Sequence, residues 1–171
     1  MFLALLLPAL AAPPANPPAA ADLPALTGTW RLAEPRPTVQ ARVESALDAM
    51  LAPFNPVIRA FARPRIVTAA TFCDTYQTTL TTTGFSVGCD GRASATAGFD
   101  QPAVAGTSPS GRAYSLIATW EGADVMFLFD SDEGGQQVRY RAEGGALIVE
   151  KTLLVDKLET KLPWEMKYVR Q

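Results

Sequence analysis

The side chains that most often carry catalysis and metal binding are few in this sequence. It contains no histidine, which removes the ordinary Ser-His and Cys-His pairs and every imidazole metal ligand. Its two cysteines, Cys73 and Cys89, suit one disulfide in an oxidising compartment, and two buried free thiols are the alternative. We therefore expect a protein that is not an enzyme, with no metal site and no cofactor. A lysine- or carboxylate-based enzyme is the alternative that the composition leaves open.

Three carboxylates gather at Asp130, Asp132 and Glu133. Such a cluster can do general acid-base work or bind calcium. The spacing suits neither role, and two glycines follow at once. We interpret the cluster as the solvated tip of a hairpin.

Length and charge narrow the class of protein. A chain of 171 residues that is 48% apolar and 19% charged can build one globular core. Its net charge of -2 produces no field that would attract phosphates, so nucleic acid is not an expected partner.

The first residues predict export. The apolar run over 1–11 ends in Ala9-Leu10-Ala11, a pattern that signal peptidase accepts, and the run is too short to span a bilayer. The Pro- and Ala-rich stretch over 12–25 predicts an extended linker, which leaves 26–171 as the folded domain. We expect a periplasmic or secreted monomer.

Apolar periodicity predicts two helices among many strands. Apolar residues at three- and four-residue spacing predict a helix from Val39 to Leu51, capped by Thr38, and a second helix that ends at Arg63-Pro64. Alternating, β-branched segments between turn signals predict strands at 28–34, 67–80, 85–90, 92–99, 112–121, 123–130, 136–142, 146–155 and 163–170. A disulfide between facing Cys73 and Cys89 would put the hairpin centre near Thr81. The predicted fold class is all-β: an antiparallel up-and-down barrel of about ten strands, with a helix-turn-helix lid between the first and second strands.

Several segments resemble the fatty-acid-binding-protein group of the calycin superfamily, to which lipocalins also belong. They are the opening Gly28-Thr29-Trp30-Arg31-Leu32, the helical pair, Leu147-Ile148-Val149-Glu150 and Lys167-Tyr168-Val169-Arg170. With the export signal, they point to an exported bacterial type.

The resemblance implies a ligand carboxylate held by arginines on two late strands and by a tyrosine on the last strand. Tyr168 matches the tyrosine, whereas Met166 and Tyr140 stand at the two arginine positions. The candidate ligand-binding residues are Tyr140, Tyr168, Arg139, Arg141, Lys151 and Met166. A site of arginines would favour a fatty acid, and a site of tyrosines with Lys151 would equally suit a hydroxylated or neutral lipid.

A barrel of about ten strands encloses more space than its own side chains fill, which suits an acyl chain or a sterol. We therefore expect non-catalytic binding and carriage of a fatty acid or another lipid. The expected lid residues are Met50, Phe54, Ile58 and Phe61, and ordinary core packing is the alternative for them. Beside the lid, Arg59, Arg63 and Arg65 would contact anionic lipid transiently. The alternative function is inhibition of a secreted protease through the segment 13–26.

Overall fold

The computed structural model describes residues 23–171 except 93–94, 109–110, 112, 133 and 156–159. Ten strands form one sheet in the order β4-β3-β2-β1-β10-β9-β8-β7-β6-β5. Their bounds are β1 (Gly28–Leu32), β2 (Thr75–Leu80), β3 (Gly84–Cys89), β4 (Ala95–Gly98), β5 (Val104–Thr107), β6 (Ala113–Glu121), β7 (Asp124–Ser131), β8 (Gly134–Glu143), β9 (Ala146–Val155) and β10 (Thr160–Arg170). Every pairing in the sheet is antiparallel, and β1 joins β2 to β10.

The sheet curls into a nearly closed barrel. β4 and β5 stand at the two ends of the strand order, and no ladder joins them in the described part of the chain. Instead, Phe99 makes a single bridge to Ala118 of β6. This curling leaves little exposed strand edge. The predicted antiparallel barrel is confirmed.

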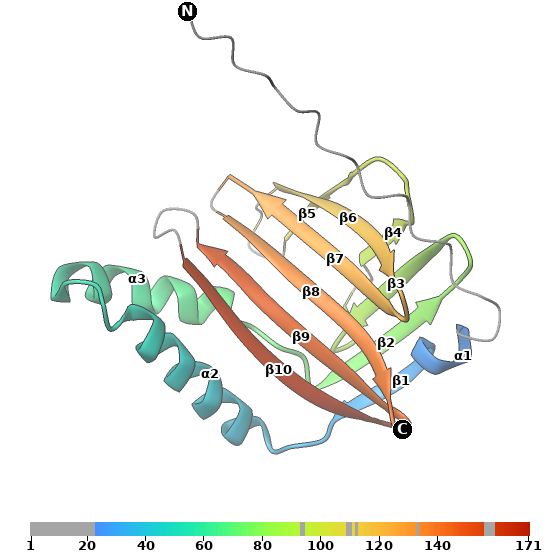
Figure 1. Cartoon of the computed structure of the whole chain (residues 1–171), viewed down its shortest axis with the longest axis horizontal. Coiled ribbons are helices and arrows are strands. Elements are labelled where there is room, and N and C mark those ends of the chain that lie inside the picture. Colours follow the sequence, from blue (N-terminus) through green and yellow to red (C-terminus); the bar gives the residue numbers. More distant parts are fainter. Residues whose placement is uncertain (1–22, 93–94, 109–110, 112, 133, 156–159) are drawn as a thin grey trace, which may run out of the picture.

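Helices connect β1 to β2, as predicted. α2 (Arg36–Leu51) and α3 (Pro56–Ala69) lie together beside β10 in Figure 1, and α2 runs along that strand. α2 buries the stripe that predicted it, Val39, Val43, Leu47 and Leu51. Asn55 caps α3 by accepting a hydrogen bond from the Ile58 amide at 2.9 Å. Among the residues described, no helix has both the length and the apolar character needed to cross a membrane.

The boundaries of the helices differ from the prediction. Pro64 does not end the second helix but lies inside α3, which continues to Ala69. A proline removes one backbone hydrogen bond, and here Thr68 Oγ1 donates to the Pro64 carbonyl at 2.9 Å one turn later. The strand expected at 67–80 therefore begins only at Thr75. Thr38 is not the cap of α2, because that helix already begins at Arg36.

Two details of the strands also differ. β5 was not predicted, because its four residues are mostly exposed and show no alternation. In the β2–β3 hairpin, Leu80 pairs with Phe85, so the turn is centred between Thr82 and Thr83 rather than near Thr81. Cys73 consequently lies before β2 and not directly opposite Cys89.

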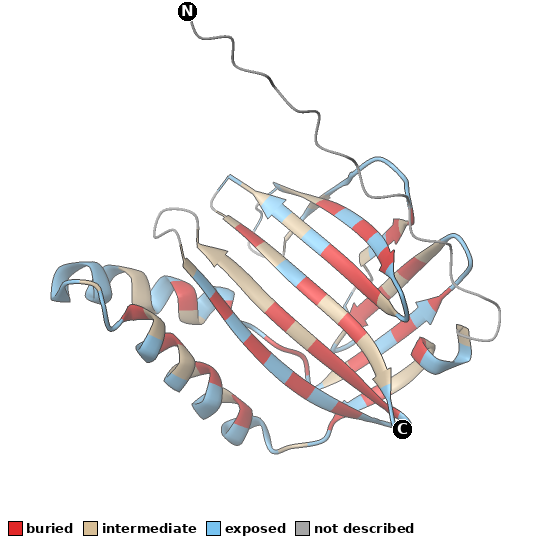
Figure 2. Cartoon of the chain, in the orientation of Figure 1, coloured by how far each residue is buried: buried red, intermediate tan, exposed pale blue. Residues whose placement is uncertain are grey.

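Side chains alternate between the inside and the outside of the barrel. Figure 2 shows buried and exposed residues alternating along β10. The buried set on β10 is Leu162, Trp164, Met166 and Tyr168. Residues that are directly opposite on paired strands point to the same face of the sheet. Trp164 is opposite Lys151, Lys151 is opposite Val138, and Val138 is opposite Phe127, so all four side chains face the inside of the barrel.

Aromatic rings fill the centre of the barrel. The Tyr76 ring lies 4.9 Å from Tyr168 and 6.1 Å from Tyr140, measured between ring centroids. Phe85 lies 5.1 Å from Tyr140 and 5.4 Å from Phe127. Because these rings come from β2, β3, β7, β8 and β10, they connect strands that are not neighbours in the sheet. The barrel centre is therefore a packed aromatic core. This differs from the prediction that about ten strands enclose more space than their own side chains fill, because large aromatic side chains from opposite walls meet in the middle.

A short helix before β1 packs against β2. In α1 (Leu23–Leu26), Leu26 is buried, and its carbonyl accepts a hydrogen bond from Thr78. Thr78 in turn accepts from Trp30 Nε1 at 2.8 Å. Arg170 lies over the Trp30 ring at 4.5 Å and donates to the Pro24 carbonyl at 3.0 Å. The folded part of the chain therefore includes Leu23–Leu26.

Candidate ligand-binding site

The charged side chain of Lys151 lies inside the barrel. Among the described residues, the buried polar or charged side chains are Thr78 and Lys151, and Lys151 is 7% exposed. Its Nζ donates to the Thr71 carbonyl at 2.9 Å. Burial lowers the pKa of Lys151 to about 8, because the ammonium group loses its hydration there.

Trp164 supplies a second donor beside Lys151. Its side chain is 6% exposed, and its Nε1 finds no hydrogen-bond partner in the part of the chain that the structure describes. The two residues are directly opposite in the β9–β10 register, which places their Cβ atoms about 5 Å apart. Leaving a buried donor unpaired costs about 1–3 kcal/mol. The pair thus offers hydrogen bonds that the protein itself does not use.

Three buried tyrosines share the interior with Lys151. Tyr168 donates to the Cys73 carbonyl at 2.9 Å. Burial raises the pKa of Tyr76, Tyr140 and Tyr168, since a phenolate would also lose its hydration. The tyrosines are therefore neutral at physiological pH. Lys151 is the cation of this interior, and no described carboxylate is buried with it.

The structure divides the predicted ligand-binding residues into two groups. The first is buried and faces inward, and it comprises Tyr140, Tyr168, Lys151 and Met166. The second comprises Arg139 and Arg141.

Arg139 and Arg141 lie on the outer face of β8. Arg139 pairs with Asp124 at 3.2 Å, and Arg141 pairs with Glu150 at 3.0 Å. The structure therefore places both arginines on the opposite face of the wall from Tyr140. The reason is strand alternation, because Tyr140 points inward and its two neighbours must point outward.

The segment 70–74, between α3 and β2, is held against the interior. Lys151 and Tyr168 donate to its carbonyls, and Phe72 within it is 4% exposed. Outside, Arg36 lies over the Phe72 ring at 4.6 Å. The predicted disulfide between Cys73 and Cys89 is confirmed, with their Cα atoms 5.5 Å apart. The segment 70–74 is therefore held by hydrogen bonds from interior side chains, by the contact of Arg36 with Phe72 on its outer side, and by the disulfide.

The inner wall is only half-buried near the β7–β8 and β9–β10 turns. We call the half-buried inward side chains there the rim: Tyr114, Phe129, Gln136, Leu153 and Val155. Leu153 is the next inward position on β9 after Lys151, and it is opposite Gln136. The mostly apolar inner wall thus reaches the surface close to Lys151.

The outer surface of the barrel and its helices is hollowed in places that do not include the interior site. One hollow of about 350 Å³ is bounded by α2 and α3, with Asp48, Leu51, Arg59, Ala60 and Arg63. Another of about 140 Å³ lies on the outer face of β7–β9, with Met126, Gln137, Arg139, Glu150 and Thr152. Neither includes Lys151 or Trp164, which are both buried.

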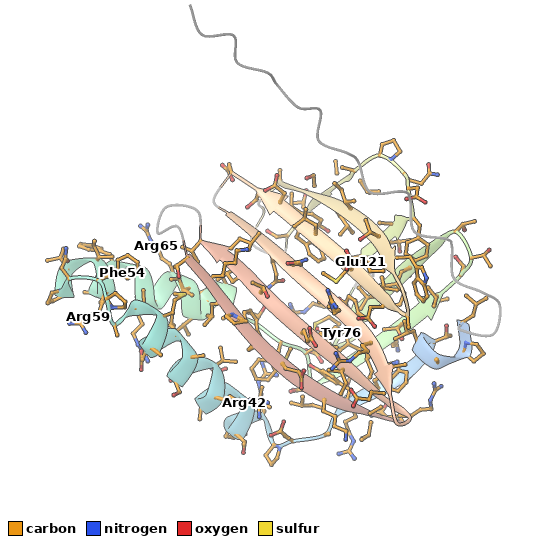
Figure 3. All side chains as sticks on the ribbon, viewed as in Figure 1. Arg42, Phe54, Arg59, Arg65, Tyr76 and Glu121 are labelled. Atoms are coloured by element: carbon orange, nitrogen blue, oxygen red, sulfur yellow. A yellow bond between two sulfur atoms is a disulfide. The ribbon has the colours of Figure 1, made fainter. Side chains whose placement is uncertain are left out.

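The predicted lid residues divide between core and surface. Met50 and Phe54 are half-buried and pack against the core. Ile58 is 36% exposed and Phe61 is 69% exposed, beside Val57 at 64%. Figure 3 shows Phe54 and Arg59 near the outer tip of the helical pair, and Tyr76 among the barrel side chains.

The three arginines beside the lid are not equivalent. Arg63 pairs with Asp48 at 2.8 Å and with Glu44 at 3.7 Å, so it joins α3 to α2. For Arg59 and Arg65, no ion pair is formed with any described residue. These two arginines are therefore the free cations of the set.

Comparison with known proteins identifies the fold. No protein-family model and no curated protein matches the chain. Among solved structures, apo lipid binding protein 8 of Caenorhabditis elegans is 14% identical with a TM-score of 0.54, over 85% of this chain and 94% of that one. The wild-type fluorescent protein UnaG is 12% identical with a TM-score of 0.54, over 85% and 96%. A secretary abundant heat soluble protein of Ramazzottius varieornatus is 8% identical with a TM-score of 0.53, over 86% and 96%. This likeness shows the fold, which is that of the fatty-acid-binding-protein-like barrels, as the resemblance implied.

Sequence reasoning did not single out Trp164 as the residue opposite Lys151. The available signal was Lys151, an inward position flanked by Glu150 and Thr152 within the mostly apolar stretch Leu147 to Val155. Its partner depends on the register of the β9–β10 hairpin, whose connection contains no glycine to mark the turn. The pairing was therefore not readable from the residues alone.

Proposed function

We propose that this protein binds and carries a hydrophobic small molecule, a fatty acid or another lipid, inside its barrel and without catalysis. The observation that carries the proposal is the inner wall, which is mostly apolar and aromatic from the rim to Lys151. Burying the apolar surface of a ligand there would contribute about 25 cal/mol per Å². A lipid binding protein of the same fold supports this function. The apolar N-terminal run and the disulfide support a location in the periplasm or outside the cell.

The packed centre determines how a ligand would enter. Aromatic rings continue from the centre to the rim, with Phe127 and Phe129 5.9 Å apart and Phe129 and Tyr114 5.5 Å apart. Phe129 and Tyr114 are half-buried, so they are easier to displace than the fully buried rings. We propose that the ligand displaces these two rim rings.

Two adjacent leucines on β9 provide a matched test of the proposal. Leu153 faces inward at the rim, opposite Leu162, and Leu154 faces outward, opposite Lys161. Leu153→Trp fills the rim and should weaken binding of parinaric acid, a fluorescent fatty acid, about tenfold, since overpacking costs about 1–3 kcal/mol. Leu154→Trp should leave the affinity unchanged.

Lipid extraction provides a second, independent measurement. Mass spectrometry of an organic extract of the purified protein should detect a stoichiometric lipid. A wild-type protein that yields no lipid and binds no probe would rule out carriage.

We also propose that α3 makes transient contact with anionic membranes. Its exposed apolar side chains are Val57, Ile58 and Phe61. The free cations Arg59 and Arg65 lie on the same helix. Apolar side chains together with cations favour adsorption to an anionic lipid surface.

The alternative function, protease inhibition through 13–26, depends mainly on residues 13–22, which lie outside the described residues. Leu23–Leu26 is helical, and its last residue is buried, so this part is not an extended strand free to enter a protease cleft. An inhibition assay with a chain lacking 13–22 tests the alternative. Protease inhibition would replace lipid carriage as the proposed function under two conditions. The intact chain must bind no lipid and inhibit a secreted protease, and the shortened chain must fail to inhibit that protease.

A further inference from the structure

We propose that Lys151 and Trp164 together bind an oxyanion at the end of the carried ligand, namely a carboxylate on an apolar chain. The inference rests on the proposed function. It adds the chemical class of the ligand and the side chains that recognise its polar end.

The interior has more donors than acceptors at this place. The Lys151 ammonium carries three N–H groups, and the Thr71 carbonyl is its one hydrogen-bond partner among the described residues. Trp164 Nε1 has none there. A ligand group that satisfies both side chains must therefore be an acceptor with more than one lone pair, as an oxyanion is.

Charge favours an anion over a neutral acceptor. Within the described chain, no carboxylate is buried beside Lys151, so the ammonium has no counter-charge. An isolated buried cation is unfavourable, and hydrogen bonds between charged partners are about twice as strong as those between neutral ones. A ligand carboxylate would supply the missing charge, whereas an ester or an alcohol would supply lone pairs alone.

The position of the pair also suits a ligand with an apolar tail. The next inward side chains on β9 are Leu153 and Val155, which belong to the half-buried rim. A carboxylate at Lys151 would therefore leave its tail along the rim, toward the surface.

This site differs from the arginine clamp that the family resemblance implied. The two arginine positions of that clamp hold Met166 and Tyr140, which are both buried. Tyr140 packs on Phe85 and Phe127, and Met166 Sδ lies 3.7 Å from the Tyr168 hydroxyl. The positions of the implied clamp thus contain no cation, and the cation of the interior comes from β9.

The test compares parinaric acid with its methyl ester on the full chain. Lys151→Met removes the cation and keeps a side chain of similar length, and Trp164→Phe removes the N–H and keeps a ring. Lys151→Met should weaken binding of the acid roughly 10- to 100-fold, as expected for a hydrogen bond to a charged group. Trp164→Phe should weaken it severalfold. Neither variant should weaken binding of the ester.

Matched controls lie on the same elements or in the same core. Lys167→Met removes an exposed cation from the outer face of β10, and Trp120→Phe trims a buried indole on β6. Both should bind the acid as the wild type does. Lys151→Arg, which keeps the charge, should retain the preference for the acid.

The outcomes separate this proposal from the proposed function. Equal loss of acid and ester in Lys151→Met, or no loss of either, would overturn the carboxylate assignment while carriage stands. A wild-type protein that binds neither probe would overturn both.

Discussion

At Lys151, an ammonium group sits in an apolar wall with a single backbone carbonyl as its partner. Its pKa is lowered from 10.5 to about 8. Below about pH 8 the folded chain therefore carries the full cost of a buried charge. Between that pH and the ordinary pKa the unfolded chain holds more protons than the folded chain, so raising the pH stabilises the fold.

Comparison of the wild type with Lys151→Met isolates this effect. As the pH rises from about 7.5 to about 10, the free energy of unfolding of the wild type should increase relative to the variant by up to about 3 kcal/mol. Urea denaturation at several pH values measures the difference. The buried tyrosines are present in both proteins, so their contribution cancels. A difference that does not change with pH would contradict the buried, charged state of Lys151.

At the scale of the element, the segment 70–74 connects α3 to the barrel. The disulfide from Cys73 to Cys89 anchors it to β3, and the interior side chains Lys151 and Tyr168 bond its carbonyls. We expect this anchoring to limit how readily the interior around Lys151 opens.

Removal of the disulfide tests this role of the segment. The double variant Cys73→Ser/Cys89→Ser should lose roughly 3 kcal/mol of unfolding free energy, the value expected for a short closed loop. It should also admit parinaric acid faster in stopped-flow fluorescence, because the segment is then held by non-covalent contacts alone. As a control, adding a reductant should lower the unfolding free energy and raise the entry rate of the wild type. It should leave both quantities unchanged in the double variant. Equal stability and equal entry rates would show that the bond does not restrain the segment.

At the scale of the whole molecule, the barrel and its helical pair expose different surfaces. The inner wall is closed to the solvent around Lys151, whereas α3 presents Val57, Ile58 and Phe61 to it. A carrier that collects ligand from a membrane would need such a face, since it would bring the barrel close to the lipid.

Transfer from vesicles tests the membrane contact. Arg59→Glu/Arg65→Glu should slow transfer of parinaric acid from anionic vesicles about tenfold or more, as each basic residue near an anionic surface contributes about 1 kcal/mol. Transfer from neutral vesicles should not change. The control variant Arg31→Glu/Arg92→Glu changes the net charge by the same amount at residues outside α3. It should take up parinaric acid from anionic vesicles at the wild-type rate. An equal effect of both double variants would point to net charge and not to a contact through α3.

Much of this architecture was predictable from local pattern. Inward and outward alternation predicted most of the strands, four-residue spacing predicted α2, and the absence of other cysteines predicted the pairing of Cys73 with Cys89. These features depend on residues close in the chain or on simple counting. β5 was missed because its mostly exposed residues give no local signal and its pairing with β6 makes it a strand. The continuation of α3 was missed because tertiary packing outweighs the helix-breaking effect of Pro64.

The amino-acid sequence by itself thus determined the class of fold, the disulfide and the apolar character of the inner wall. Only the tertiary structure decided that Tyr140 faces inward while Arg139 and Arg141 face outward, and that Lys151 and Trp164 are opposite each other on paired strands. A shift of one residue in strand register exchanges the two faces of a strand. Which face of these hairpins points inward depends on packing across the barrel against strands distant in the chain, as where Tyr140 packs on Tyr76 and Phe85. The position of the cation could therefore be learned only from the folded barrel.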